Sequence, residues 1–319
     1  MSLNGYFEYR QSLKYAQYTA FNFLKRASMA CKPLALIITG ILLTPNFATA
    51  NTTISKGNSE QTAEQAAKEL ANPNTAYASL NLKLQYSGGY DGGGDSFATV
   101  LQPTLPFPMD NGDKVIFRPA ISYVQNDFNV NTPTSFQHMD QSGVSDISFD
   151  LAYAPKMVGG TIAAFGLFAS LPTGNSELTA DQFAVGPEFM YGKVSAERVV
   201  GVFPSHLYGV SGKGADHSDT RINKTSTQLF WVELLEGGWT VCSAPTLSYD
   251  WNKDQAEIPL NISVSKTAVL NGRPWKFGIE ANYYIEKDEK TRPDFMLSFN
   301  ISPVVENNWR LYSINLGLV

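Results

Sequence analysis

From residue 76 onward the chain repeats one pattern, in which roughly nine to eleven residues alternate between apolar and polar or small side chains and are closed by a turn. At 79–86, for example, Leu80, Leu82 and Leu84 alternate with Asn81 and Lys83. Successive side chains of a β-strand point to opposite faces, so each stretch has one apolar and one polar face. A helical period would scatter the same residues around the axis.

The pattern recurs about twelve times. Outside the N-terminal region, no apolar run is long enough to cross a bilayer as a helix. Lipid offers no hydrogen-bonding partner to open strand edges, so strands that cross a membrane must close into a barrel. We therefore predict an all-β fold, a transmembrane antiparallel up-and-down β-barrel of about 12 strands over 76–303. Residues 304–319 are either a tail or a closing strand, and the second case allows about 14 strands.

The expected strands lie at 78–87, 96–105, 114–124, 146–154, 161–171, 182–191, 198–208, 222–233, 239–249, 257–265, 275–285 and 295–303. Connections after even-numbered strands are mostly short, whereas those after odd-numbered strands include long loops such as 125–145 and 209–221. This arrangement is typical of outer-membrane barrels with both chain ends in the periplasm. Aromatic residues near the strand ends, such as Tyr249 on one side and Trp239 on the other, match the two membrane girdles. Prolines inside several stretches are expected to mark bulges or strand ends near the periplasmic rim.

The N-terminal region has the features of an export signal. An apolar core at 34–43 is too short for a membrane helix, and small residues ending at Ala50 follow it at the spacing that a signal peptidase recognises. We predict a cleavable signal peptide over 1–50; a start at Met29 would give a signal of ordinary length. Export and the strand pattern together predict the outer membrane of a Gram-negative bacterium.

A short helix is expected in the leader at 51–75. Residues 59–70 are rich in helix formers, Ser59 is a candidate N-cap, and Asn72 with Pro73 would end the helix. The leader either remains a solvated periplasmic segment, which is the interpretation we favour, or folds into the lumen as a plug.

Charge and cysteine content narrow the expected partners. The net charge is −5, and residues 1–50 carry five basic side chains against one acidic one, so removal of the signal leaves a more acidic protein. Nucleic acid is therefore not an expected partner. Outer-membrane lipid and lipopolysaccharide are expected, together with a small-molecule solute. Cys31 leaves with the signal, so the exported chain keeps the single thiol of Cys242.

The candidate site residues are charged side chains on the polar faces of the strands, which a barrel would point into its lumen: Lys83, Arg118, Asp146, Asp150, Glu188 and Glu280. Buried charge without water or a partner is costly, so the lumen must be wet, salt-bridged or both. These residues either line a passage and select solutes or pair across the lumen and hold the barrel together. The sequence leaves both interpretations open.

We predict no catalytic, cofactor-binding or metal-binding set, and therefore no enzyme. Ser205 and His206 are neighbours on one strand and face opposite ways, which prevents the hydrogen-bonded dyad that activates a serine. His217 lies in a glycine-rich loop, and Asp91 with Asp95 supplies too few ligands for a calcium loop.

Eight stretches between about residue 69 and residue 309 together resemble a known family. They are ELANPNTAYASLNLKLQY, GDKVIFRPA, SDISFDLAY, LPTG, VGPE, GWTVCSAPTLSYD, SKTAVLNGRPWKF and SPVVENNW. The set resembles outer-membrane barrel transporters grouped with phenol meta-pathway proteins, some of which carry the misleading label neuromedin U. The resemblance implies an outer-membrane barrel and passive uptake of small organic or aromatic compounds.

The sequence thus favours an outer-membrane channel or facilitator for the passive passage of small solutes, with apolar and aromatic compounds among the candidates. The alternative is a non-conducting structural or adhesive barrel whose extracellular loops bind a partner. A less favoured alternative is an outer-membrane enzyme that modifies lipids.

Overall fold

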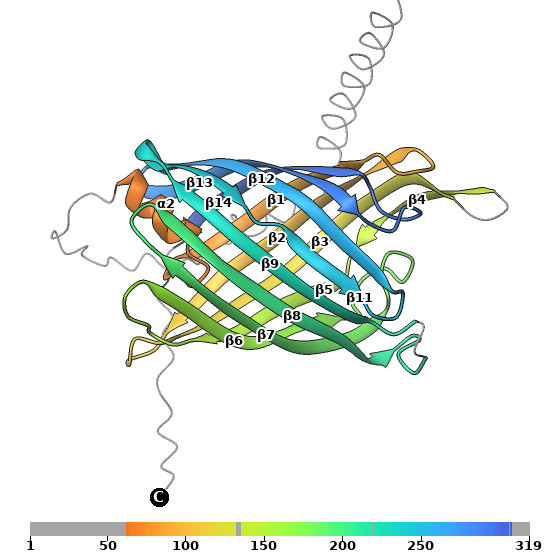
Figure 1. Cartoon of the computed structure of the whole chain (residues 1–319), viewed down its shortest axis with the longest axis horizontal. Coiled ribbons are helices and arrows are strands. Elements are labelled where there is room, and N and C mark those ends of the chain that lie inside the picture. The colour runs from red at the N-terminus through yellow and green to blue at the C-terminus, as the bar shows by residue number, and fades with distance from the viewer. Residues whose placement is uncertain (1–61, 132–134, 218–219, 306, 308–319) are drawn as a thin grey trace, which may run out of the picture. The chain divides into compact units, whose positions relative to one another are not determined.

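The structure is a computed structural model that describes residues 62–131, 135–217, 220–305 and 307. These residues form a closed antiparallel β-barrel (Figure 1). Closure depends on β1 (Ala78–Gly88), which pairs on one side with β2 (Gly94–Pro108) and on the other with β14 (Phe295–Val305). Leu82 of β1, for example, lies opposite Leu101 of β2 and Ile301 of β14.

The other strands, in chain order, are β3 (Lys114–Asn131), β4 (Phe136–Val144), β5 (Ile147–Ala154), β6 (Thr161–Leu171), β7 (Gln182–Val194), β8 (Arg198–Gly212), β9 (Asn223–Leu234), β10 (Trp239–Ser243), β11 (Thr246–Asp250), β12 (Gln255–Leu270) and β13 (Arg273–Glu286). Strands β4 and β5 pair with successive parts of β3, and β10 and β11 both pair with β9 and β12. The barrel therefore has 12 strand positions, which confirms the predicted fold. The suggested extra strand after 308 lies outside the described residues.

The two ends of the barrel differ in their connections. One end, here the short-turn end, carries 109–113, 155–160, 195–197, 271–272 and the turn with the 3₁₀ helix η1 (Glu236–Gly238). The other, the long-loop end, carries 89–93, 172–181, 213–222, 251–254 and 287–294, together with the β3–β4 hairpin. Most of the predicted 125–145 loop is thus strand: β3 and β4 pair from Tyr123 with Val144 to Asn131 with Phe136.

The predicted proline bulges are found at some positions and not at others. Pro245 separates β10 from β11, and Pro259 lies at a register shift against β13. Pro119, Pro187 and Pro204, in contrast, lie within regular pairing opposite Phe149, Leu167 and Thr227. A proline within an antiparallel ladder removes one donor, and the bonds on either side keep the register.

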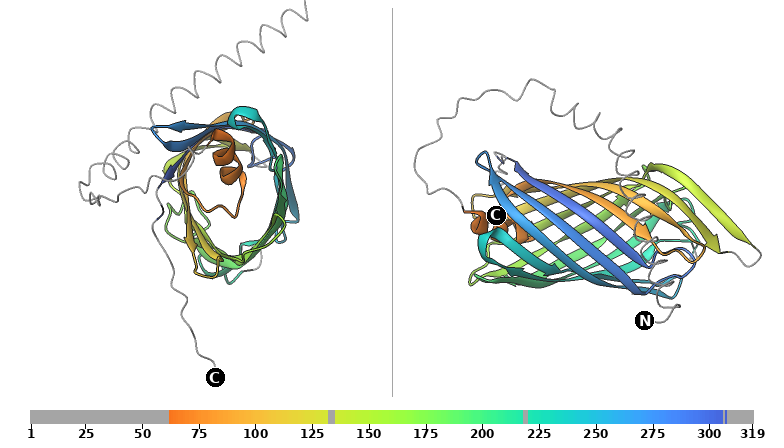
Figure 2. Two further views of the ribbon diagram at one scale, coloured as in Figure 1. Left: turned by 90° about the vertical axis from the view of Figure 1, so that its left-hand side faces the viewer. Right: turned by 90° about the horizontal axis from the view of Figure 1, so that it is seen from above.

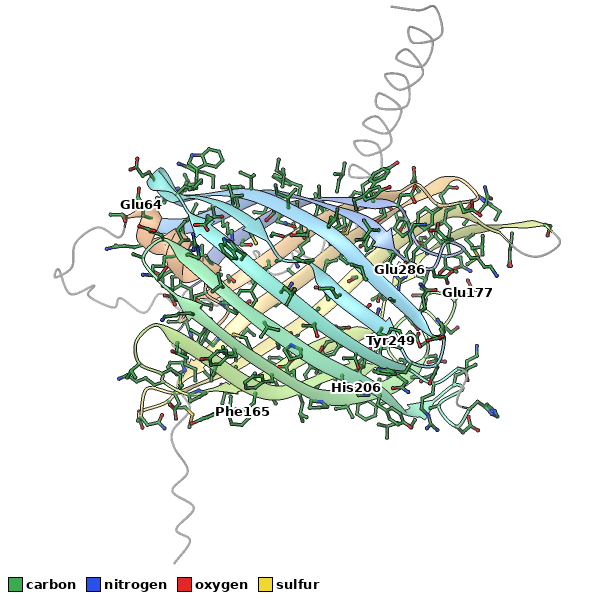
Figure 3. The ribbon with its side chains drawn as sticks, in the orientation of Figure 1. Glu64, Phe165, Glu177, His206, Tyr249 and Glu286 are labelled. Carbon is green, nitrogen blue, oxygen red and sulfur yellow. The ribbon has the colours of Figure 1, made fainter. Side chains whose placement is uncertain are left out.

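The alternation places large apolar side chains on the outside of the barrel. Exposed positions on the outer face include Phe165 and Leu167 of β6, Leu260 and Ile262 of β12, and Ile279 of β13. Phe165 projects away from the barrel wall in Figure 3. An apolar belt of this extent on a closed barrel is typical of a surface that faces lipid. Among the described residues, no helix is both long enough and apolar enough to cross a membrane.

Helix α2 (Ala63–Ala71) lies at the short-turn end, inside the ring of strands (Figure 2). It contacts η1, β9, β10, β12 and β13. Residues 63–71 of the leader thus lie in the lumen, contrary to the favoured solvated interpretation; residues 51–61 lie outside the described residues. The helix also begins later than predicted: its N-cap is Thr62 instead of Ser59, because Thr62 and Gln65 form a capping box that satisfies the first free amides.

Candidate functional site

The lumen is the candidate functional site, and its short-turn end is crossed by residues 62–75, which we call the plug segment. The helical part of the plug segment buries Ala66 and Ala67 completely or nearly so. Small alanine side chains allow the helix to lie close to the barrel wall, and Ala63 packs on Gly238 in the β9–β10 turn. At Gly238, φ is +79°, which favours glycine, and a Cβ there would lie 3.0 Å from the Cβ of Ala63.

The first turn of α2 is also held by a carboxylate. Glu64 Oε1 accepts a hydrogen bond of 2.8 Å from the backbone amide of Gly237. The backbone amide of Glu64 itself, the hydroxyl of Thr62 and the Gly237 amide all favour the charged form, and they lower the pKa of the Glu64 carboxyl below its ordinary value. The charged form of Glu64 therefore stabilises the contact between the helix and the turn.

After the helix, the plug segment crosses to the opposite wall. Glu69 Oε1 accepts hydrogen bonds from the hydroxyl of Thr75, at 3.1 Å, and from the amide of Ala76, at 2.6 Å, which fold the segment back on its helix. Lys114 Nζ on β3 then donates to the backbone oxygen of Asn74 at 2.7 Å. In the strand order β3 lies across the ring from β10 and β12, so the segment spans the lumen.

Inward-facing apolar side chains under the plug segment form a buried cluster: Ile116, Ala152, Ala154, Ile162, Ala164, Met190, Val199, Phe230 and Val232. Ala71 of the plug segment packs against this cluster. The cluster follows from the sequence, because these positions lie on the lumen side of β3 and β5–β9. Burial of this apolar area stabilises the plug segment in the lumen.

A cavity of about 350 Å³, here the luminal cavity, lies between the plug segment and the barrel wall. Of the predicted site residues, Lys83, Arg118 and Glu280 line it. Glu280 accepts hydrogen bonds from the side-chain amides of Asn261 at 2.8 Å and of Asn282 and Asn300 at 3.3 Å each. The structure therefore brings three of the six residues to one space.

The other three predicted residues have different surroundings. Asp150 forms an ion pair of 3.4 Å with Arg118. Glu188 is only 4% exposed and shares with Arg118 a small cavity of about 10 Å³. Asp146 lies just before β5, where Oδ1 accepts the amides of Thr173 and Gly174, so it caps a loop at the long-loop end.

Several lumen residues were missed by the sequence interpretation. Lys276 lines the luminal cavity beside the polar side chains of β12 and β14, and Lys114 anchors the plug segment. Both follow from the strand alternation, since Lys276 precedes outward Phe277 and Lys114 precedes outward Val115. Both lie within the predicted strands 114–124 and 275–285, so the alternation alone was sufficient to find them.

Charged residues also meet near the long-loop end of the lumen. Glu257 of β12 forms ion pairs with two cations. Its Oε2 atom lies 3.3 Å from Nε of Arg292 in the β13–β14 loop and 3.8 Å from Nζ of Lys224 of β9. The ring of Tyr90, in the β1–β2 loop, stacks on Phe128 with a centroid distance of 4.0 Å. These contacts hold two long loops against the inner wall.

The candidate dyad residues face opposite ways. Ser205 lies opposite luminal Glu188, whereas His206 Nδ1 lies 2.9 Å from the hydroxyl of Thr225, on the outer face. Among the described residues, no group of three or more histidine, cysteine or carboxylate side chains is placed to hold a metal ion.

Comparison with known proteins shows the class of fold. A crystal structure of an outer-membrane channel from Pseudomonas putida F1 matches with a TM-score of 0.56 and 12% identity, over 72% of this chain and 95% of that chain. The NanC porin matches with a TM-score of 0.47 and 12% identity, over 71% of this chain and 99% of that chain. The KdgM porin matches with a TM-score of 0.43 and 10% identity, over 72% of this chain and 99% of that chain. No family model and no curated protein matches the sequence. The fold is thus that of an outer-membrane β-barrel, and at these identities the likeness extends to the fold alone.

Proposed function

We propose that the protein is an outer-membrane channel for small solutes, with its short-turn end in the periplasm. One observation carries the proposal: a closed barrel with an apolar outer belt encloses a lumen that is lined by polar and charged side chains and holds a cavity of about 350 Å³. A wet lumen inside an apolar belt is the property of a barrel that lets water and solutes enter.

The plug segment narrows this path at the periplasmic end. Two hydrogen bonds hold it, one between Glu64 and Gly237 and one between Lys114 and Asn74. Its Ala71 side chain packs against the buried apolar cluster. Small solutes pass beside it or during its displacement. The resemblance to barrels grouped with phenol meta-pathway proteins supports uptake of small organic compounds as part of the proposal, and it rests on the sequence stretches alone.

Two observations favour the second candidate, a non-conducting structural or adhesive barrel. The ordered helix inside the lumen and the Arg118–Asp150 ion pair are features of a filled barrel. The β3–β4 hairpin at the long-loop end would then be the surface that contacts a partner. The size of the luminal cavity and the polar side chains on one of its walls favour the channel.

Liposome swelling with the refolded protein tests the proposal. Folding is first checked by the heat-sensitive gel mobility of a closed barrel. Sugars, carboxylates and small aromatic alcohols are then offered separately, with heat-unfolded protein as the control. Uptake of at least one class is expected. Folded protein that admits none would contradict the channel and favour the structural barrel.

A further inference from the structure

The luminal cavity has one polar wall, built by β1, β12, β13 and β14. Hydroxyl and amide groups dominate it, and Lys83 and Lys276 bring ammonium groups to it. Both lysines lie on the inner face by register, since Lys83 is opposite Asn300 and Lys276 is opposite Ser302. The polar wall therefore offers donors and positive charge to a bound molecule.

Positive charge exceeds negative charge among the side chains of this wall. Within the described part of the chain, Lys83 and Lys276 form no ion pair, while the third cation of the lining, Arg118, is paired with Asp150. Glu280 is the carboxylate of the lining, and its oxygens are bound by three asparagine amides. The amides leave the negative charge of Glu280 in place, so the two lysines and this carboxylate give the lining a net charge of 2 − 1 = +1, which favours an anion.

The facing wall is apolar. It is made by Phe230 and Val232 of β9, Ala244 after β10, and Ala71 and Pro73 of the plug segment. Phe230 lies over Gly201, where the absence of a side chain leaves room for its ring. A flat apolar group between this wall and the polar wall would be removed from water on one side while its charged end met the lysines.

From these two walls we propose that the luminal cavity binds a small aromatic carboxylate, with the carboxylate at Lys83 and Lys276 and the ring against Phe230 and Pro73. This deepens the proposed function, on which it rests, by giving the class of solute that the channel retains. Charge-assisted hydrogen bonds to the lysines set the preference for an anion, and the apolar wall sets the preference for a ring.

Isothermal titration calorimetry of the refolded full mature chain in detergent at pH 7.5 tests the inference with three probes. Benzoate has both features, gluconate has the carboxylate without the ring, and benzyl alcohol has the ring without the charge. Saturable binding of benzoate at one site is expected, with the other two at least about tenfold weaker. Gluconate or benzyl alcohol binding as tightly as benzoate, or no benzoate binding by folded protein, would overturn it.

Lysine variants locate the site. Lys83→Met and Lys276→Met are each expected to weaken benzoate binding about tenfold, the usual effect of removing one hydrogen bond to a charged group. Lys193→Met is the matched control, because Lys193 lies exposed on the outer face of β7. Unchanged affinity in folded Lys83 and Lys276 variants would disprove the placement. Liposome swelling with uncharged solutes tests the channel separately, so loss of benzoate binding with retained swelling rejects only this inference.

Discussion

Lys114 Nζ on β3 donates a hydrogen bond of 2.7 Å to the backbone oxygen of Asn74, across the lumen from the strands that hold helix α2. The plug segment is therefore fixed at both walls. The bond joins a charged donor to the backbone, so it is expected to contribute about 1.5–3 kcal/mol.

Lys114→Met removes this anchor and is expected to raise the population of displaced plug segment by about tenfold or more. Planar-bilayer recordings would show this as a larger fraction of time in the higher-conductance state. Lys193→Met, on the outer face, serves as the control and should match the wild type. Equal open fractions for Lys114→Met and the wild type would show that the anchor does not hold the segment.

Alanine substitutions at two adjacent glycines distinguish the effect of a lost helix contact from the effect of backbone strain. Both glycines have a positive φ, 67° at Gly237 and 79° at Gly238. A Cβ added at Gly238 would lie 2.7 Å from the backbone oxygen of Thr267 and 3.0 Å from the Cβ of Ala63. A Cβ added at Gly237 would have Lys266 Nζ as its nearest atom, at 3.4 Å. Gly238→Ala should displace the helix and raise conductance, and Gly237→Ala should share only the strain, about 1 kcal/mol. Similar conductance in the two variants would contradict the contact between α2 and the turn.

Acid is expected to loosen the plug segment through Glu64. The pKa of Glu64 is lowered in the folded state, so its contribution is fully present above the ordinary value of 4.5 and is lost as the pH falls through the lowered folded pKa. Conductance should stay constant from pH 7 to pH 5 and rise below about 4.5. Glu64→Gln is expected to abolish this rise; a rise of the same size in that variant would assign the acid effect to another group.

Arg118 forms an ion pair of 3.4 Å with Asp150, and the Glu188 carboxyl lies beside this pair in the lumen. Arg118→Met leaves the Asp150 carboxylate without its cation and beside Glu188, so we expect a loss of about 3–5 kcal/mol in the free energy of unfolding, measured by urea titration of the barrel in lipid. The added substitution Glu188→Gln should recover part of it. Arg198→Met removes an exposed ion pair with Glu233 on the outer face and should cost much less, because solvent screens this pair. Equal losses for the two arginines would show that the lumen screens charge as bulk water does.

The strands could be predicted from sequence because lipid contact imposes the alternation. Where one face must be apolar, as at Phe165 and Leu167, the pattern appears in every strand. The β3–β4 hairpin was missed because its residues, such as Asn129 and His138, lie at the long-loop end, where neither face need be apolar.

The position of the plug segment could not be read from the helix pattern. Ala66 and Ala67 are buried against a wall that is itself assembled from strands distant in sequence. Alanines on a polar helix are also common in solvated segments, so the sequence did not distinguish the two cases. The convergence of Lys83, Lys276 and Glu280 on one cavity likewise depends on the register between β1, β13 and β14.

The central claim, that the lumen conducts and the plug segment limits it, is tested most directly by single-channel recording of the wild type beside Lys114→Met and Gly238→Ala in the same planar bilayer. We predict small, discrete wild-type conductance and a larger or more persistent open state in both variants. Folded protein that gives no conductance in any of the three would contradict it.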